Sequence, residues 1–300
     1  MISLDSETAW PALNFADWEA TCDTLHMWTQ IVGKTRMALA PRENHWWNVT
    51  LRVTPRGLTT TPIPFGHTTF DVEFDFIAHK LVIRTSEGQE HGIRLYPRSV
   101  ADFYGEYMAS LRALGIEVKL NCAPAEFDDP TPHDQDHHHA SFDVSHVESF
   151  RRILVNSDRI LKKFRSRFIG KCSPVQFFWG SFDLAVTRFS GRPAILAPDA
   201  DPVTREAYSH EVISCGFWPG DRKFRQPAFY SYTAPAPPGL DRERYWNTQL
   251  SEFILTYDDA RHAESPDPTI LDFCQSTYES GARLAKWDRA GLERQITHHA

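Results

Sequence analysis

Residues 168–191 read FIGKCSPVQFFWGSFDLAVTRFSG, and residues 31–57 read IVGKTRMALAPRENHWWNVTLRVTPRG. Both stretches carry an apolar pair, then Gly-Lys, then an aromatic cluster, then an alternating run that ends in Val-Thr and an arginine. The same order of features in two places indicates one structural unit written twice. This duplication decides the fold that we expect.

The similarity continues beyond the two stretches. Residues 100–115, VADFYGEYMASLRALG, match residues 270–285, ILDFCQSTYESGARLA. The matched pairs are Asp102/Asp272, Phe103/Phe273, Ser110/Ser280 and Leu114/Leu284. Chance similarity between two α+β segments is the competing explanation.

Apolar periodicity predicts the secondary structure around the stretches. Steps of three and four residues predict helices over 15–34, 100–114, 147–171 and 270–284, with Gly33 ending the first of them. Alternation of apolar and polar residues predicts strands. The strand candidates are 45–54, 70–76, a hairpin over 81–96, 176–189, 210–218, 228–233 and 252–257.

These patterns predict an α+β fold built from two pseudo-symmetric α–β4–α repeats. Residues 1–121 form the first repeat, 122–146 an acidic linker rich in His and Pro, and 147–300 the second repeat. Antiparallel sheets with one apolar face must bury that face. We expect the two sheets to pack together, or to merge into one curved sheet, with a central cleft as the ligand site.

Bulk composition excludes several classes of protein. The 300 residues are 41% hydrophobic and 24% charged, with a formal charge of −7, so no nucleic-acid partner is expected. No apolar run is long enough for a membrane span, and the N-terminus lacks a signal-peptide pattern. Five scattered cysteines form no visible disulfide or CxxC pattern, which favours a cytoplasmic protein.

Four segments also resemble a known family. They are LHMWTQIVGK, NHWWNVTLRVTPRGLTT, FIGKCSPVQFFWGSFDLAVTRFSGR and YSHEVISCGFWPG. The resemblance is to a bacterial family catalogued only as a domain of unknown function, and it spans the chain from Trp10 to Trp287. It implies a bacterial cytoplasmic protein of this length, and it supplies no reaction.

Histidines on apolar strand faces are the leading catalytic candidates. His45 and His210 each lie where the other repeat has a phenylalanine, and an imidazole in an apolar wall suits acid–base chemistry. Glu211 neighbours His210 and points to the opposite face if the strand is regular. With His26, the two histidines would form a divalent-metal site, although no spacing demands one. Hydrogen-bonded core histidines are the alternative for each.

Other side chains are candidates for the same site. Asp183 lies in an apolar strand, so we expect its carboxylate to be paired or its pKa to be shifted. It would either orient a histidine or pair structurally with Arg188 or Lys171. Arg56 and Arg188 end equivalent strands and suit an anionic substrate group, with strand-end salt bridges as the alternative. The aromatic candidates for substrate contact are Trp47 and Trp179, and Trp218, Tyr230 and Tyr232 are candidates for a stacking wall.

The sequence therefore supports three functional hypotheses. The first is an enzyme that acts on a small anionic or aromatic metabolite by histidine acid–base chemistry, with or without a metal. The second is a small-molecule binding module that uses the same cleft without turnover. The third is an interaction protein that uses the basic helix over 147–171. The cofactor and the oligomeric state are not predicted.

Overall fold

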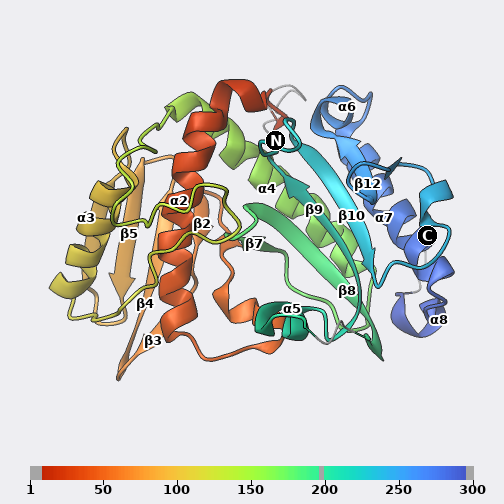
Figure 1. The fold of residues 1–300 in the computed structure, drawn as a ribbon, viewed down its shortest axis with the longest axis horizontal. Coiled ribbons are helices and arrows are strands. Elements are labelled where there is room, and N and C mark those ends of the chain that lie inside the picture. The colour runs from red at the N-terminus through yellow and green to blue at the C-terminus, as the bar shows by residue number, and fades with distance from the viewer. Residues whose placement is uncertain (1–8, 196–198, 295–300) are drawn as a thin grey trace, which may run out of the picture.

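The computed structural model describes residues 9–195 and 199–294, and within these residues the strands form two six-stranded antiparallel sheets (Figure 1). The first sheet has the order β1-β2-β4-β5-β6, with β3 paired to β4. The second has the order β11-β12-β10-β9-β8-β7. The predicted α+β class, with antiparallel sheets, is confirmed.

Each sheet is preceded by a long helix and followed by a shorter one. The first half contains α2 (Phe15–Leu39), η1 (Asn44–Val49), β1 (Arg52–Val53), β2 (Gly57–Thr59), β3 (Ile63–Phe65), β4 (Thr68–Asp75), β5 (Lys80–Thr85), β6 (Glu90–Arg94) and α3 (Val100–Ala113). The second contains α4 (Val144–Ser166), β7 (Gln176–Phe178), β8 (Asp183–Pro193), α5 (Pro202–Ala207), β9 (His210–Trp218), β10 (Ala228–Ala234), η2 (Leu240–Arg242), β11 (Trp246–Asn247), β12 (Glu252–Thr256), α6 (Tyr257–Arg261), α7 (Pro266–Leu284) and α8 (Arg289–Leu292).

Aromatic side chains hold the helices on the sheets. In the first half, Trp28 of α2 stacks on Phe103 of α3 at 4.7 Å between ring centroids, and Phe103 stacks on Phe74 of β4. In the second half, Phe164 of α4 meets Tyr278 of α7 edge to face at 6.1 Å. Helices cover one face of each sheet, and α4 touches β1 and β2 of the first sheet as well as β8 and β9 of the second. Among the described residues, no helix is long and apolar enough to cross a membrane.

The two sheets meet edge to edge. The backbone amides of Leu51 and Phe177 donate to each other's carbonyl groups, both at 2.9 Å, and this bridge joins the β1 edge to the β7 edge. The apolar sheet faces pack against helices. The merged-sheet alternative is thus nearer to the observed arrangement than face-to-face packing of the two sheets.

The strand predicted over 45–54 is wrong for most of its length. His45 and Trp46 have left-handed backbones, with φ of 58° and 62°, inside η1, and only Arg52–Val53 is a strand. Burial does not follow the alternation, because the His45 ring and Asn48 are buried while Trp46 lies under the guanidinium group of Arg42 and Val49 is half-buried. Local periodicity cannot distinguish such a turn from a strand.

The helix predicted to stop at Gly33 instead continues to Leu39. Gly33 has a different role, because a Cβ atom there would lie 2.3 Å from the indole of Trp179. The glycine lets the second sheet approach α2 closely. The basic helix is shorter than predicted, since α4 ends at Ser166 and not at residue 171.

The stretch predicted as a linker is held firmly against the first half. Residues 116–143, all of which the structure describes, contain no helix or strand. The side-chain amide of Gln30 nevertheless pairs with the backbone of Ala125, and His133 is only 1% exposed. The carbonyl of His139 accepts from the first amide of α3. The segment also reaches the second half, where Asp128 pairs with Lys223, and α4 begins at Val144, within the range predicted as linker.

Candidate functional site

The second sheet has two chemically different faces. The helices α4 and α7 pack on one side of this sheet (Figure 1). Arg188 and Cys215 point to that side, because the guanidinium of Arg188 donates to the carbonyl of Phe164 in α4 and the thiol of Cys215 donates to the carbonyl of Cys274 in α7. Alternation along the strands places a polar and aromatic set on the opposite side. We call that side the tyrosine face, and its members are Asp183, Thr187, His210, Ser214, Tyr230, Tyr232 and Glu252.

A buried carboxylate anchors one end of the tyrosine face. Asp183 is 7% exposed and accepts a hydrogen bond from the hydroxyl of Ser181 at 2.5 Å and another from the hydroxyl of Tyr230. The tyrosine reaches it across Gly216, where a Cβ atom would lie 2.5 Å from the phenol oxygen. The glycine on the intervening strand therefore keeps a path open between β10 and β8.

Two further carboxyl groups lie near this anchor and share its electrostatics. Burial, followed by the charge of Asp183, raises the pKa of Glu252 to about 7. The same two causes raise the pKa of Glu126. Burial also raises the pKa of Asp183, although the two hydrogen bonds oppose that shift. The cluster thus holds carboxyl groups that exchange protons closer to neutral pH than free carboxylates do.

Hydroxyl groups continue the polar surface away from the carboxyls. The phenol oxygens of Tyr208 and Tyr232 lie 2.9 Å apart, and the hydroxyls of Thr187 and Ser214 lie 3.1 Å apart. The rings of Tyr230 and Tyr232 are nearly parallel, with centroids 6.2 Å apart. Burial raises the pKa of both tyrosines, so they remain protonated and able to donate hydrogen bonds.

A histidine–lysine pair lies at the far end of β8. Nδ1 of His45 faces the carbonyl oxygens of Glu206 and Ala207 at 3.0 and 3.2 Å, so this nitrogen must carry the proton. Nε2 is then an acceptor, and Nζ of Lys171 donates to it at 2.6 Å. Burial first, and Lys171 second, lower the pKa of His45. The imidazole is therefore held neutral.

The structure brings His45 and His210 together, as the sequence predicted. Their ring centroids are 5.9 Å apart, and the hydroxyl of Ser209 lies 3.1 Å from Nδ1 of His210. Trp47 packs on the His45 ring at 5.3 Å, so this substrate-contact candidate also lies in the corner. Ser209 contacts His210, and the neighbouring Tyr208 contacts Tyr232, so these two residues link the His45–His210 pair to the hydroxyl groups of the tyrosine face.

A family model matches residues 10–294, which include both sheets and every residue of the tyrosine face. The chain belongs to the DUF5996 family, a family of unknown function. The membership covers the whole arrangement described above, and it assigns no reaction to it. Neither the curated proteins nor the solved structures include a significant match to the chain.

The predicted metal site of His26, His45 and His210 is not assembled in this DUF5996 chain. Nε2 of His26 lies 2.8 Å from the carbonyl of Gly180, and the His26 ring stacks on Phe182, near the start of β8. His45 and His210 lie at the other end of that strand. Across the two described ranges, no three His, Cys, Asp or Glu side chains are grouped to hold a metal ion.

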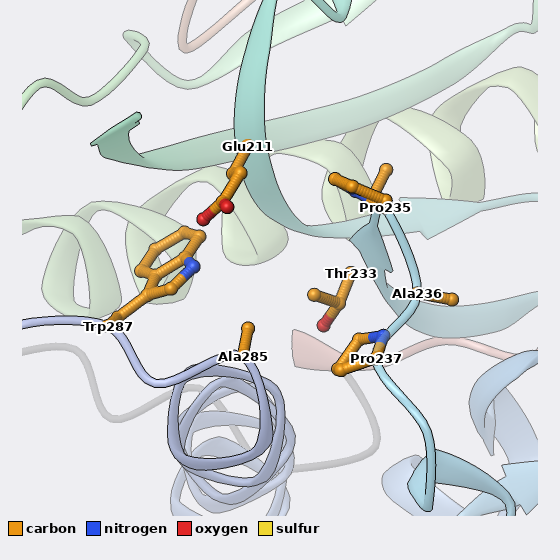
Figure 2. Close-up of a pocket in the computed structure, with 8 residues that line it drawn as sticks. Glu211, Thr233, Pro235, Ala236, Pro237, Ala285 and Trp287 are labelled. Atoms are coloured by element: carbon orange, nitrogen blue, oxygen red, sulfur yellow. The ribbon is translucent and has the colours of Figure 1, made fainter. Parts of the chain in front are cut away.

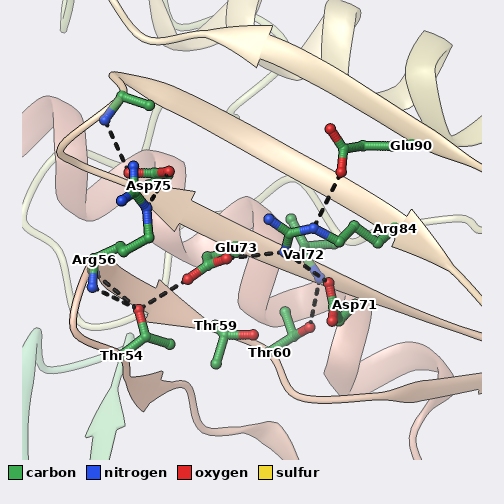
Figure 3. A network of polar contacts seen from close by, with 12 residues as sticks. Thr54, Arg56, Thr59, Thr60, Asp71, Val72, Glu73, Asp75, Arg84 and Glu90 are labelled. Atoms are coloured by element: carbon green, nitrogen blue, oxygen red, sulfur yellow. Dashed lines mark hydrogen bonds and ion pairs between the residues drawn. The ribbon is translucent and has the colours of Figure 1, made fainter.

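The two arginines predicted to bind substrate lie elsewhere. Arg56 is on the outer surface of the first sheet, where its Nε donates to Asp75 at 2.6 Å beside a network centred on Glu73 and Arg84 (Figure 3). Arg188 is 0% exposed and lies 3.5 Å from the ring centroid of Phe164 and 4.2 Å from that of Tyr278. Arg56 thus follows the salt-bridge alternative, and Arg188 is a core residue.

Trp179 and Glu211 also take other positions. Trp179 packs against Gly33, and its indole donates to the carbonyl of Val49 at 2.7 Å. Glu211 points to the helix-covered side of β9, as regular alternation requires, and pairs with Arg192 at 2.6 Å. Neither side chain belongs to the tyrosine face.

Sequence reasoning missed Glu126, Glu252 and Tyr208. They come from three separated segments, and nothing in their local spacing marks them. The one available signal was the alternation of Tyr230 and Tyr232, which placed two phenols on one strand face. Their role in holding a buried carboxylate becomes visible only when β8 and β10 are placed on either side of Gly216.

Proposed function

We propose that this protein is an enzyme that performs acid–base chemistry on a small polar metabolite at the tyrosine face. The observation that carries the proposal is the Asp183–Tyr230 pair, together with two carboxyl groups whose pKa values are raised beside it. Titratable groups with environments that separate their pKa values supply an acid and a base in one site.

Each group has a distinct part in the proposal. Asp183, fixed by two hydroxyl donors, acts as the carboxylate that accepts a proton or orients a substrate hydroxyl. Glu252 acts as the acid, because its pKa of about 7 leaves a large protonated fraction at neutral pH. His45 and His210 lie beside Trp47 at the other end of β8, about 20 Å from Asp183, so they do not act on the same small substrate as the carboxyl groups.

The substrate class follows from charge and shape. Three carboxyl groups favour amines and hydroxyl groups over anions, and the two arginines that suggested an anionic substrate lie outside the site. The parallel rings of Tyr230 and Tyr232 suit a flat or ring-shaped body. We therefore propose an aromatic or hydroxylated metabolite in place of an anionic one.

The pseudo-symmetry of the two halves, the division at 122–146 and a central cleft are part of the same proposal. The matching order of long helix, antiparallel meander and closing helix supports the symmetry. A bacterial, cytoplasmic location is also proposed, on the resemblance and the absence of a disulfide pattern in the sequence.

The interaction hypothesis has weaker support, because much of the basic surface of α4 is already paired. Arg151 contacts Glu148 at 2.6 Å, Arg159 contacts Asp267, and Lys162 contacts Asp158 at 2.6 Å. A groove of 550 Å³ does lie beside this helix, lined by Val155 and Lys163 among others. Its occupant would have to compete with these internal ion pairs.

The test is a comparison of substrate consumption by matched variants. The wild type, Asp183→Asn and the control Glu117→Gln, an exposed residue on the first half, are incubated with a pool of small amines, polyols and phenols, and each compound is followed by mass spectrometry. We expect one class to be consumed by the wild type and the control, and roughly 100-fold more slowly by Asp183→Asn.

Two outcomes would contradict the enzyme proposal. Equal consumption by the wild type and Asp183→Asn would remove the carboxylate from the mechanism. A compound that binds in ligand-observed NMR but is never consumed would favour the non-catalytic binding module. Circular dichroism of each variant checks that the fold is retained.

A further inference from the structure

A cavity lies on the side of the second sheet that is opposite to the tyrosine face. It has a volume of 220 Å³ and is formed between β9, β10, the loop after β10 and the residues that follow α7 (Figure 2). Its lining is Glu211, Thr233, Ala234, Pro235, Ala236, Pro237, Ala285 and Trp287. It is smaller than most sites for drug-sized ligands, so it suits a small metabolite.

Two buried polar atoms in this lining have no hydrogen-bond partner. The hydroxyl of Thr233 and the indole nitrogen of Trp287 are both unpaired within the described residues, and each side chain is 6% exposed. Figure 2 shows the indole nitrogen on the side of its ring that faces Thr233 and Pro235. Leaving a buried donor unpaired costs roughly 1–3 kcal/mol, so a ligand that pairs with either group recovers that cost.

The third polar group is held in place from outside the cavity. Arg192 donates to Oε2 of Glu211 at 2.6 and 2.9 Å and to the carbonyl of Ala285 at 2.6 Å. This clamp fixes the carboxylate against the end of α7 and leaves Oε1 without a hydrogen bond among the described residues. The cavity therefore offers one fixed acceptor in addition to the two unpaired groups.

We propose that this cavity is a binding site for a short amino alcohol. The amine donates to Oε1 of Glu211, and the ligand's hydroxyl oxygen accepts from the indole of Trp287 and pairs with the hydroxyl of Thr233. The short carbon chain lies against Pro235 and Pro237. One molecule then satisfies all three groups. The site is independent of the proposed reaction at the tyrosine face.

The experiment uses 3-amino-1-propanol as the probe and the indole N–H signals of the full chain as the readout. A Trp287→Phe variant assigns the signal of Trp287 in a ¹⁵N-correlated NMR spectrum. We expect the probe to shift this signal saturably. Propylamine, which lacks the acceptor, and 1-propanol, which lacks the cation, are expected to bind roughly tenfold or more weakly.

Matched variants separate this site from the other face. Thr233→Val keeps the shape and removes the unpaired hydroxyl, and Glu211→Gln keeps the contact with Arg192 and removes the charge. Each is expected to weaken binding of the probe roughly tenfold. Asp183→Asn, on the tyrosine face, is expected to bind the probe as the wild type does.

Three results would overturn the proposal. They are the absence of a saturable shift at the Trp287 signal, an equal affinity in Thr233→Val, and equal binding of propylamine. The first would indicate a cavity filled by water only. Because Thr233→Val removes a hydroxyl that has no partner, it is expected to fold at least as stably as the wild type, and thermal unfolding of the free protein checks this.

Discussion

Nζ of Lys171 lies 2.6 Å from Nε2 of His45, so a cation donates directly to an imidazole that is kept neutral. The positive charge opposes protonation of the ring and, after burial, is the second cause of its lowered pKa. We therefore expect Lys171→Met to raise the pKa of His45 relative to the wild type. Titration of the histidine Cε1–H signals by NMR measures the change.

The same pair predicts a pH dependence of stability. Because the pKa of His45 is lower in the folded state, its contribution is complete above pH 6.5 and decreases as the pH falls through the folded value. Lys171→Met should reduce this loss. Lys119→Met, an exposed lysine on the first half, is the matched control. A pKa of His45 that stays the same or falls in Lys171→Met would contradict the prediction.

Gly216 is expected to tolerate no side chain. A Cβ atom there would lie 2.5 Å from the phenol oxygen of Tyr230 and 2.5 Å from the carbonyl oxygen of Leu184. Gly216→Ala should lower the free energy of unfolding by about 1–3 kcal/mol and displace Tyr230 from Asp183. Urea unfolding provides the measurement.

Gly92 in β6 serves as the control for this substitution. It is also in a strand, but a Cβ atom there would meet nothing closer than Cδ of Lys80 at 4.0 Å. Gly92→Ala should leave stability unchanged or raise it by up to about 1 kcal/mol. Equal effects at the two glycines would show that close packing at Gly216 is unimportant.

Glu252 should make the folded protein less stable at alkaline pH. Its pKa rises from 4.5 to about 7 on folding, so its protonated form is preferred and the associated stability is lost as the pH rises through about 7. Glu252→Gln should therefore gain about 3 kcal/mol relative to the wild type at pH well above 7 and little below pH 4.5. Denaturant titrations across this range, with Glu117→Gln as control, test the sign. A gain that does not change with pH would refute the assignment.

His26 should account for part of the loss of folding stability at acidic pH. Burial lowers its pKa from 6.5 to about 4, so its contribution is complete above pH 6.5 and decreases as the pH falls toward 4. The loss amounts to about 3 kcal/mol. His26→Gln should flatten the stability curve between these pH values, whereas His67→Gln, on an exposed turn, should leave it unchanged. A His26→Gln variant whose stability falls as steeply with pH as that of the wild type would contradict the prediction.

Much of the fold was predictable because long periodic segments dominate it. The strand over Phe70–Phe76, the hairpin of β5 and β6 and the helices α2, α3 and α7 follow from apolar spacing alone. The errors lie where tertiary contacts override local pattern. His45 and Trp46 occupy a left-handed turn. The His45 ring is held by the carbonyl of Glu206, which is distant in the sequence, and the Trp46 ring is held by the nearby Arg42.

The candidate site was predictable only in part. His45 and His210 lie close together, as expected for a shared site, although the strand assumed for His45 was wrong. The arginines were misplaced because alternation reveals which face a residue takes but not whether helices cover that face. Arg188 is buried for this reason. The carboxyl cluster depends on the pairing order β8-β9-β10-β12, which a single sequence does not specify.

The pair of hydrogen bonds between Leu51 and Phe177 affects how readily the protein can aggregate through its sheet edges. Unpaired strand margins invite addition of strands from other chains, which begins aggregation. Here the inner margins of both sheets shield each other. Of the outer margins, β11 is two residues long, and β6 carries the charges of Glu90 and Arg94. These features limit the addition of further strands at the β11 and β6 margins.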